Sequence, residues 1–232
     1  MEKPADTDFC TPFCYVRDMS GAAGLCGVIL AAGESTRMGS DKALLPWPPI
    51  FAGQIPSGTF LSAAIQSLTL QTELVIVVAG KNAPMLAPVV YSAGASMVVN
   101  PAPELGQFSS LQLGLREVLN RGRDAAMVTL VDRPPASART IQKLNEAFVD
   151  ALHRYQWAVI PEFRGRHGHP LVAGREMIEA FLKAPPESNA REIRDRYAEK
   201  IVYVEVDDPM TIANVNTPAD YTSIGNSSTQ HA

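Results

Sequence analysis

Cysteine, charge and long apolar runs are all scarce in this sequence. Only three cysteines occur among 232 residues, an odd count that argues against a disulfide framework and favours a reducing, cytoplasmic compartment. Cys10 and Cys14 have no second cysteine or histidine cluster at ligand spacing, which argues against a zinc site. No run reaches the roughly 18 apolar residues that a membrane helix needs. Acidic rather than basic residues precede the apolar stretch 19–33, unlike a secretory signal.

Charged residues make up 19% of the chain and give a net charge of −4, from 20 Lys and Arg against 24 Asp and Glu. This balance excludes a global basic surface for nucleic acid or acidic membranes, so a bound anion must be held by a local site. The hydrophobic content of 46% is ample for one buried core. We expect a flexible N-terminal extension over 1–24, one domain over 25–224 and a polar tail over 225–232.

Short apolar runs alternate with longer amphipathic stretches from residue 26 onward, which predicts parallel strands joined by crossover helices. Runs in the first half are rich in Val, Ile and Leu without alternation, as in strands buried on both faces, and mixed pairing is expected in the second half. The predicted fold is α/β, with a mostly parallel central sheet and flanking helices. Strands are expected at 26–32, 74–80, 96–100, 125–132, 157–163, 169–174 and 201–208, helices near 111–119, 141–152, 175–183 and 189–200, and an irregular Pro-rich loop at 46–59.

A glycine-rich segment directly follows the first predicted strand, LAAGESTRMGSDKALLP from Leu30 to Pro46. Its glycines let the backbone turn tightly near a phosphate, and Arg37 and Lys42 supply cations for the oxygens. The spacing matches neither the P-loop nor the dinucleotide-binding G-x-G-x-x-G pattern. The glycines alone are also compatible with a plain strand-to-helix turn that carries two solvated cations.

The longer pattern L-A-A-G-x-S-x-R-M-G-x-x-K-x-L-L-P resembles the signature of the MobA/MocA-like NTP transferases, the molybdenum cofactor branch of the nucleotidyltransferases. The resemblance covers about 25–222 and implies a Rossmann-like domain of the nucleotide-diphospho-sugar transferase type. In that family the loop wraps the triphosphate of an NTP. The resemblance therefore implies catalytic roles for Arg37 and Lys42 and nucleotide binding by Leu30, Ala31, Ala32, Gly33, Ser35 and Gly39, with a turn or helix cap as the alternative for Ser35.

The segment after the third predicted strand resembles the part of the family whose polar groups contact the nucleobase. This resemblance implies nucleotide binding by Asn100, Gly106 and Ser109. Asn100 also precedes Pro101, a position at which asparagine commonly closes a turn, and that remains the alternative.

Two further blocks carry oxygen ligands suited to Mg²⁺. Asp132 ends an apolar run, and ligand sites of open α/β sheets lie outside the carboxyl ends of the strands. The resemblance implies that Asp132, in an Asp-Arg-Pro sequence, binds Mg²⁺ together with Asn216 in the block NVNTP. An amide oxygen can ligate magnesium without adding charge. The alternatives are a helix cap for Asp132 and a turn-shaping role for Asn216.

The block GRHGHP at 165–170 resembles a G-x-x-G-H-P block near the acceptor of the cytidylyltransferases. It implies acceptor binding by Arg166 and His169, with a hairpin turn bearing surface imidazoles as the alternative. Residues 187–191 (ESNAR) stand where many members have a phosphate-contacting G-D-x-G-x-R block, and they lack its Gly and Asp. This departure leaves the acceptor less well defined than the nucleotide.

The resemblance implies Mg²⁺-dependent transfer of NMP from an NTP to a phosphate-bearing acceptor such as molybdopterin, with release of pyrophosphate. The blocks Ala31-Ala32-Gly33 and Gly168-His169-Pro170 resemble those of cytidylyltransferases and favour CTP. The Asn214-Val-Asn216 block resembles that of guanylyltransferases and favours GTP. A sugar-phosphate nucleotidyltransferase and a non-catalytic accessory protein of molybdenum cofactor handling are the alternatives. A molybdoenzyme or a maturation protein is the macromolecular partner that the resemblance implies.

Overall fold

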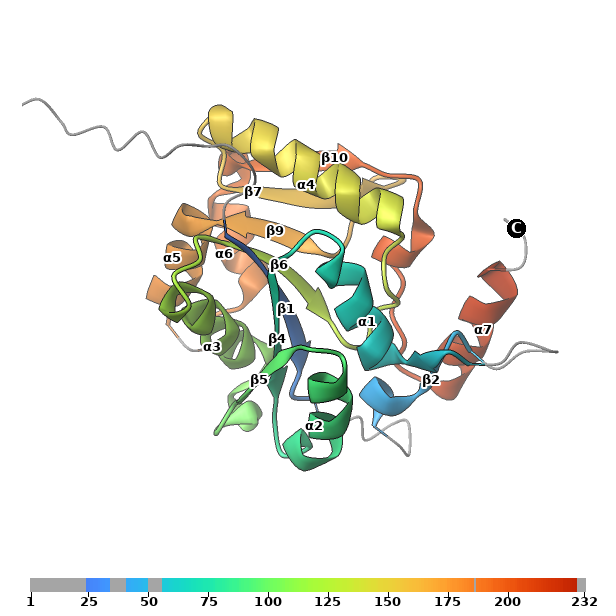
Figure 1. Ribbon diagram of the computed structural model, residues 1–232. Coiled ribbons are helices and arrows are strands. Elements are labelled where there is room, and N and C mark those ends of the chain that lie inside the picture. Colours follow the sequence, from blue (N-terminus) through green and yellow to red (C-terminus); the bar gives the residue numbers. More distant parts are fainter. Residues whose placement is uncertain (1–23, 34–40, 50–55, 186, 229–232) are drawn as a thin grey trace, which may run out of the picture.

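An eight-stranded sheet runs through the protein, with helices covering both of its faces (Figure 1). The computed structural model describes residues 24–33, 41–49, 56–185 and 187–228. The expected N-terminal extension, with Cys10 and Cys14, lies outside these ranges. The α/β class and the mostly parallel sheet expected from the sequence are confirmed.

The strands and helices agree closely with the apolar runs of the sequence. The strands are β1 (Leu25–Ala31), β2 (Pro46–Trp47), β3 (Gly58–Thr59), β4 (Leu74–Ala79), β5 (Ser96–Val99), β6 (Ala125–Leu130), β7 (Ala158–Phe163), β8 (Arg166–His167), β9 (Leu171–Gly174) and β10 (Ile201–Glu205). The α-helices are α1 (Phe60–Thr69), α2 (Ala83–Ser92), α3 (Gln107–Asn120), α4 (Ala138–His153), α5 (Arg175–Lys183), α6 (Ala190–Arg196) and α7 (Pro218–Ser228), and the 3₁₀ turns are η1 (Lys42–Leu44), η2 (Pro103–Leu105), η3 (Ala198–Lys200) and η4 (Pro209–Thr211).

The strand order places a crevice beside the central strand. The order is β10-β7-β9-β6-β1-β4-β5, with β8 paired to β7. From β1 the chain first builds outward through β4 and β5, and it then returns to add β6 on the other side of β1. All three of these neighbours are joined in parallel, whereas β9 is antiparallel to both β6 and β7. Such a reversal of strand order opens a crevice at the carboxyl ends of the strands, here between β1 and β6.

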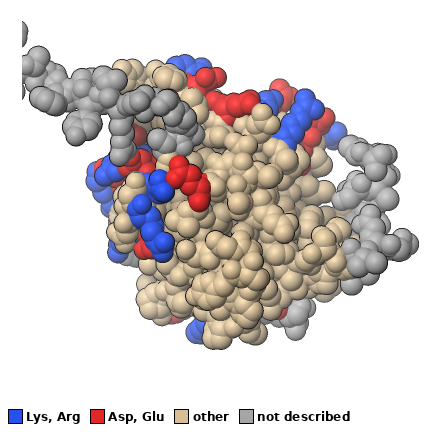
Figure 2. Space-filling view, in the orientation of Figure 1, with Lys and Arg blue, Asp and Glu red and all other residues tan. Residues whose placement is uncertain are grey.

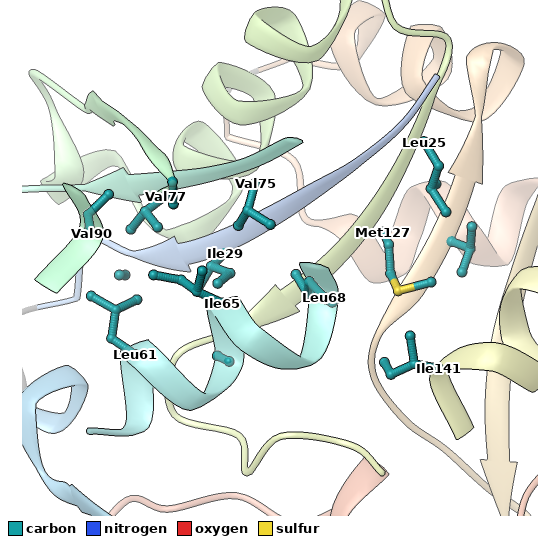
Figure 3. Close-up of a cluster of buried hydrophobic side chains, with 14 of the residues drawn as sticks. Leu25, Ile29, Leu61, Ile65, Leu68, Val75, Val77, Val90, Met127 and Ile141 are labelled. Carbon is teal, nitrogen blue, oxygen red and sulfur yellow. The ribbon is translucent and has the colours of Figure 1, made fainter. Parts of the chain in front are cut away.

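Alternate residues of the strands face two separate cores. Leu25 and Ile29 of β1 pack under α1, α2 and α4, and Cys26 and Val28 pack under α3, α5 and α6. Figure 3 shows the first core, in which Leu61 and Ile65 of α1 point toward the central strands. Because β1 is buried along its whole length, its end is held rigidly beside its neighbours.

A third, smaller core attaches α7 to the segment that follows the glycine-rich loop. Phe60 packs against Trp47 and Tyr221, and the Tyr221 hydroxyl donates a hydrogen bond of 2.7 Å to the carbonyl of Pro46. The strands β2 and β3 form a separate two-stranded pair in the expected Pro-rich loop, of which 50–55 lie outside the described residues. The C-terminal helix thus supports the backbone near Lys42.

Besides the β2–β3 pair, the structure differs from the expected elements in two stretches. The stretch 189–200, expected as one helix, divides into α6 and η3 at Tyr197, whose ring packs against Trp157. Helix α7 continues to Ser228, into the polar tail expected over 225–232, and residues 229–232 lie outside the described ranges.

Charged side chains avoid one part of the surface. On the face in Figure 2, Lys and Arg alternate with Asp and Glu near α4 and β10, whereas the surface over α1 and α2 is almost free of charge. Neither α1 nor α2 contains a charged residue. Among the described residues of this face, neither sign forms a broad patch. None of the described helices has the length and apolarity to cross a bilayer.

Gly168 packs directly against η4, and a substitution at this glycine tests how much the contact stabilises the fold. A Cβ atom at Gly168 would lie 2.5 Å from the backbone oxygen of Thr211, and a backbone atom cannot move aside as a side chain can. We therefore expect Gly168→Ala to lower the free energy of unfolding by about 2 kcal/mol in urea denaturation. Gly33→Ala is the matched control, because no described atom lies within 4 Å of the position that its Cβ atom would take. Equal unfolding midpoints for Gly168→Ala and the wild type would contradict the expectation.

Candidate active site

A cavity of about 160 Å³ lies at the crevice between β1 and β6, and we call it the smaller cavity. The end of β1 contributes Leu30, Ala32 and Gly33, and the turn after β6 contributes Asp132. The lining is completed by Lys42, Pro103, Gly106, Gln107, Ser110 and Val131. Residues from four separate stretches of the chain therefore converge where the topology predicts a ligand site.

Lys42 is a buried cation in this cavity. Its side-chain Nζ donates a hydrogen bond of 3.0 Å to the Oδ1 atom of Asn216, a residue 174 positions away. The preceding residue, Asp41, caps η1, because its Oδ1 atom accepts from the backbone N–H of Ala43 at 2.9 Å. The position of Lys42 thus depends on Asp41 and on the C-terminal part of the chain.

Asn82 holds Asp41 in place, a role that the sequence reasoning missed. Its Nδ2 donates to the Oδ2 atom of Asp41 at 2.7 Å and to the carbonyl of Ala31 at 2.9 Å. Its Oδ1 atom accepts from the N–H of Gly80 at 3.0 Å. Asn82 therefore joins the ends of β1 and β4 to the Lys42 turn. Its place shortly after the apolar strand β4 was the available signal, because the same kind of position identified Asp132.

Asp132 lines the smaller cavity. Its Oδ1 atom is buried and has no hydrogen-bond partner among the described residues. Its backbone carbonyl accepts from the N–H of Val215 at 2.8 Å, and this bond brings the neighbouring Asn216 to the same turn. The structure therefore places Asp132, Asn216 and Lys42 in one region, as the resemblance implied. Their roles in catalysis and metal binding stay predictions.

The backbone of Asn216 is fixed by Asp220 in the first turn of α7. The Oδ2 atom of Asp220 accepts from the N–H groups of Asn216 and Thr217, each at 2.9 Å. These hydrogen bonds, with a smaller contribution from the Lys42 charge, hold the pKa of Asp220 below its usual value. The turn therefore depends on an ionised carboxylate.

Several predicted nucleotide-binding residues can be placed, and others cannot. Leu30 and Ala31 end β1, and Ala32 and Gly33 follow at the cavity. Ser35, Arg37 and Gly39 lie in 34–40, outside the described residues, so their phosphate-binding and catalytic roles remain predictions.

Asn100 and Ser109 build the turn that carries Gly106. The Nδ2 group of buried Asn100 donates to the Oγ atoms of Ser109 and Ser110, each at 2.9 Å, and its Oδ1 accepts from the N–H of Ala102. Gly106 has φ of +94°, which favours glycine, and it lines the cavity. These bonds match the turn-closing alternative for Asn100, and nucleobase contact stays a prediction.

A second cavity of about 450 Å³ adjoins the first, and we call it the larger cavity. The two share Leu30, Gly106 and Gln107. His169 lines the larger cavity, whereas exposed Arg166 in β8 is not among the residues lining either one. The larger cavity is also lined by Leu105, Phe108, Leu111, Val128, Leu130, Arg133, Leu171, Ser188, Asn189, Ala190, Arg191 and Arg194.

His169 is neutral at physiological pH. Burial, followed by the charges of Arg133 and Arg194, lowers its pKa to about 3. Its backbone N–H donates to the carbonyl of Thr211 at 2.8 Å, and its Nδ1 atom is buried with no partner in the described part of the chain. The imidazole can therefore hydrogen-bond a ligand in the larger cavity but cannot supply a positive charge.

Known proteins share this fold and sequence pattern. The chain is 29% identical over 202 residues to a probable molybdenum cofactor guanylyltransferase of Rhodopirellula baltica, covering 84% of this chain and 89% of the relative. It is 23% identical over 198 residues to the molybdenum cofactor cytidylyltransferase of Escherichia coli, covering 84% and 92%. The crystal structure of Rv0371c from Mycobacterium tuberculosis matches with a TM-score of 0.72 at 21% identity, covering 88% and 97%. A structure of Rv0371C in complex with manganese matches with a TM-score of 0.65 at 18% identity, covering 88% and 99%.

The sheet topology is that of the nucleotide-diphospho-sugar transferase fold. Residues 27–201 match the model of the MobA-like NTP transferase domain. The chain therefore belongs to the MobA-like NTP transferase family and is a nucleotidyltransferase.

Asp220 gives the site a predictable pH dependence. Because its pKa is lowered in the folded state, ionised Asp220 stabilises the fold above its unfolded pKa, and this contribution is lost as the pH falls through the folded value. We expect Asp220→Asn to lower the melting temperature at about pH 7, and the difference from wild type to shrink below about pH 4. Asp195→Asn, which removes an exposed carboxylate 3.8 Å from Arg191, is the control. A difference that stays constant with pH would contradict the role of the charge.

Proposed function

We propose that this chain transfers NMP from an Mg²⁺-bound NTP to a phosphate-bearing acceptor such as molybdopterin, with release of pyrophosphate. CTP is the proposed donor, and GTP is the second candidate. The observation that carries the proposal is the convergence of a buried cation, Lys42, and a buried, unpartnered carboxylate oxygen of Asp132 at one cavity. The described residues thus offer opposite charges where an NTP and its metal ion need them.

The residues of the smaller cavity fit a hard cation. An unpartnered, buried carboxylate oxygen is costly unless a ligand or ion satisfies it, and Asp132 Oδ1 is such an atom. No group of three or more His, Cys, Asp or Glu suited to a metal occurs among the described residues. This favours Mg²⁺, which commonly takes one or two protein oxygens and completes its shell with substrate phosphates and water. Asp132 would hold the ion and Asn216 would assist, because its Oδ1 atom keeps one lone pair beside the bond from Lys42.

The proposed reaction needs alignment and charge stabilisation more than proton transfer. An oxygen of the acceptor phosphate forms a bond to the α-phosphorus, and the bond from that phosphorus to the oxygen bridging to the β-phosphate breaks. The acceptor oxygen is already ionised, so no general base is required. Bound Mg²⁺ would neutralise charge on the phosphate oxygens. Lys42 would bind a phosphate oxygen as a buried point charge whose position is fixed by Asn216 and the Asp41 cap.

Different observations support CTP and GTP as the donor nucleotide. Ala31-Ala32-Gly33 and Gly168-His169-Pro170 resemble cytidylyl-type blocks, and these support CTP. Asn216 lies in a guanylyl-type block, and several relatives of this chain are named guanylyltransferases, which makes GTP the specific alternative. The names of both kinds of relative support molybdopterin as the acceptor.

A calorimetric titration with CTP, GTP, UTP and ATP tests the donor and the metal site together. We expect selective, Mg²⁺-dependent binding of CTP, because the carboxylate of Asp132 would hold an ion that neutralises the charge of the phosphates. Asp132→Ala should weaken this binding about 100-fold. Asp195→Ala, in exposed α6, is the control. Selective binding of GTP would replace the donor, and absence of binding to all four would favour the non-catalytic accessory role.

Lys42 is expected to contribute to turnover. Because loss of one preorganised charge costs on the order of 3 kcal/mol, Lys42→Ala should reduce kcat about 100-fold or more. The assay measures pyrophosphate release with CTP or GTP and molybdopterin. Lys143→Ala is the matched control, because that exposed lysine in α4 contacts only the carbonyl of Glu205 among the hydrogen bonds described. A normally folded Lys42→Ala protein with near-normal turnover would refute the role of the lysine.

A further inference from the structure

The larger cavity has two chemically different walls. Leu105, Phe108 and Leu130 belong to an apolar wall, and Arg133, Arg191 and Arg194 bring guanidinium groups to the same space. No Asp or Glu is among the described residues that line it. At about 450 Å³ it lies within the usual range of small-molecule sites. Its lining therefore suits a molecule that combines an apolar ring system with a negative charge.

Polar atoms without partners point to a ligand in this cavity. The Nε atoms of Arg133 and Arg194 and the Nδ1 atom of His169 are buried and lack hydrogen-bond partners among the residues that the structure describes. Buried donors are normally paired, since leaving one unpaired is costly. The charge of Arg194 acts on both Arg133 and His169, so these groups converge on one region. Within the described ranges, Arg133 also donates to the carbonyl of Ala213 at 3.3 Å, which fixes its position.

The larger cavity continues into the proposed nucleotide site. Leu30, Gly106 and Gln107 line both cavities, and Arg133 directly follows Asp132 in the chain. A molecule in the larger cavity would therefore lie beside a nucleotide bound in the smaller cavity. The acceptor is the substrate that must occupy such a place, because its phosphate has to reach the α-phosphorus.

We infer that the larger cavity binds the acceptor, with Arg133 and Arg194 holding an anionic group and the apolar wall packing against a flat heterocycle of about pterin size. This inference rests on the proposed function and adds residues that the sequence reasoning did not identify. Arginine suits the task, because its planar fork of donors matches carboxylate and phosphate oxygens. Arg191 ends the stretch 187–191 that departs from the family pattern, and Arg194 lies three residues further on. The stretch that departs from the pattern therefore lies where arginines line the larger cavity.

Binding of pterin-6-carboxylate tests the inference without knowledge of the natural acceptor. This probe joins a fluorescent heterocycle to one anionic group, and pterin is the matched probe that lacks the carboxylate. Fluorescence titrations would use the full chain, Arg194→Gln, and Arg154→Gln as a control at an exposed arginine in the C-cap of α4. We expect Arg194→Gln to weaken binding of pterin-6-carboxylate about tenfold or more and to leave binding of pterin and of Mg²⁺-CTP or Mg²⁺-GTP unchanged. Arg154→Gln should match the wild type with every probe.

The outcomes separate this inference from the proposed function. Wild-type binding of Mg²⁺-NTP without any binding of pterin-6-carboxylate would overturn the acceptor assignment and leave the nucleotide site standing. Equal losses for pterin and pterin-6-carboxylate in Arg194→Gln would also overturn it, because the cavity rather than the charge would then have changed. Arg194-dependent binding of pterin-6-carboxylate without binding of any NTP would support the anion site and refute the proposed transfer reaction. Thermal unfolding of each variant shows whether the fold is retained.

Discussion

The parallel pairing of β1 with strands on both sides is the constraint on which the site depends. The register joins Ala31 to Ala79 and Leu30 to Leu130, so the neighbouring strands end at one level and their following turns meet. Burial of β1 in both cores prevents this edge from shifting. The backbone groups at the strand ends still need partners, and the buried side chain of Asn82 supplies them. The same amide fixes the turn that carries Lys42, so sheet geometry and placement of the cation are coupled.

The polar groups that lack partners gather where substrates are proposed to bind. Of the six buried side-chain atoms without a hydrogen bond in the described part of the protein, four belong to Asp132, Arg133, Arg194 and His169, all of which line one of the two cavities. Elsewhere the buried polar side chains are largely satisfied, as Asp208 is by Ser137, Thr140 and Met210. The protein therefore accepts an energetic cost at the cavities that a ligand can relieve.

Sequence patterns predicted the sheet and the residues next to strand ends. Continuous apolar runs identify buried strands, and the strand-end rule selects Asp132, because both depend on local order in the chain. The roles of Asn82 and Arg194 depend on tertiary placement, which no local pattern encodes. Arg166 and His169 also show what a sequence motif leaves undetermined. They are three positions apart in one motif, yet Arg166 is exposed in β8 and His169 lines the larger cavity. The hydrogen bonds of Asn100 likewise depend on how the turn folds, so the sequence alone does not predict them.

The Lys42–Asn216 hydrogen bond limits how early the site can form while the chain is being synthesised. The bond joins residues 174 positions apart, and the turn that carries Asn216 is fixed by Asp220 in the final helix. A chain still attached to the ribosome can pair its early strands before the segment that carries Asn216 and Asp220 has emerged. It then lacks the contact that positions Lys42, so a nascent chain cannot form this contact until that segment is free to pack.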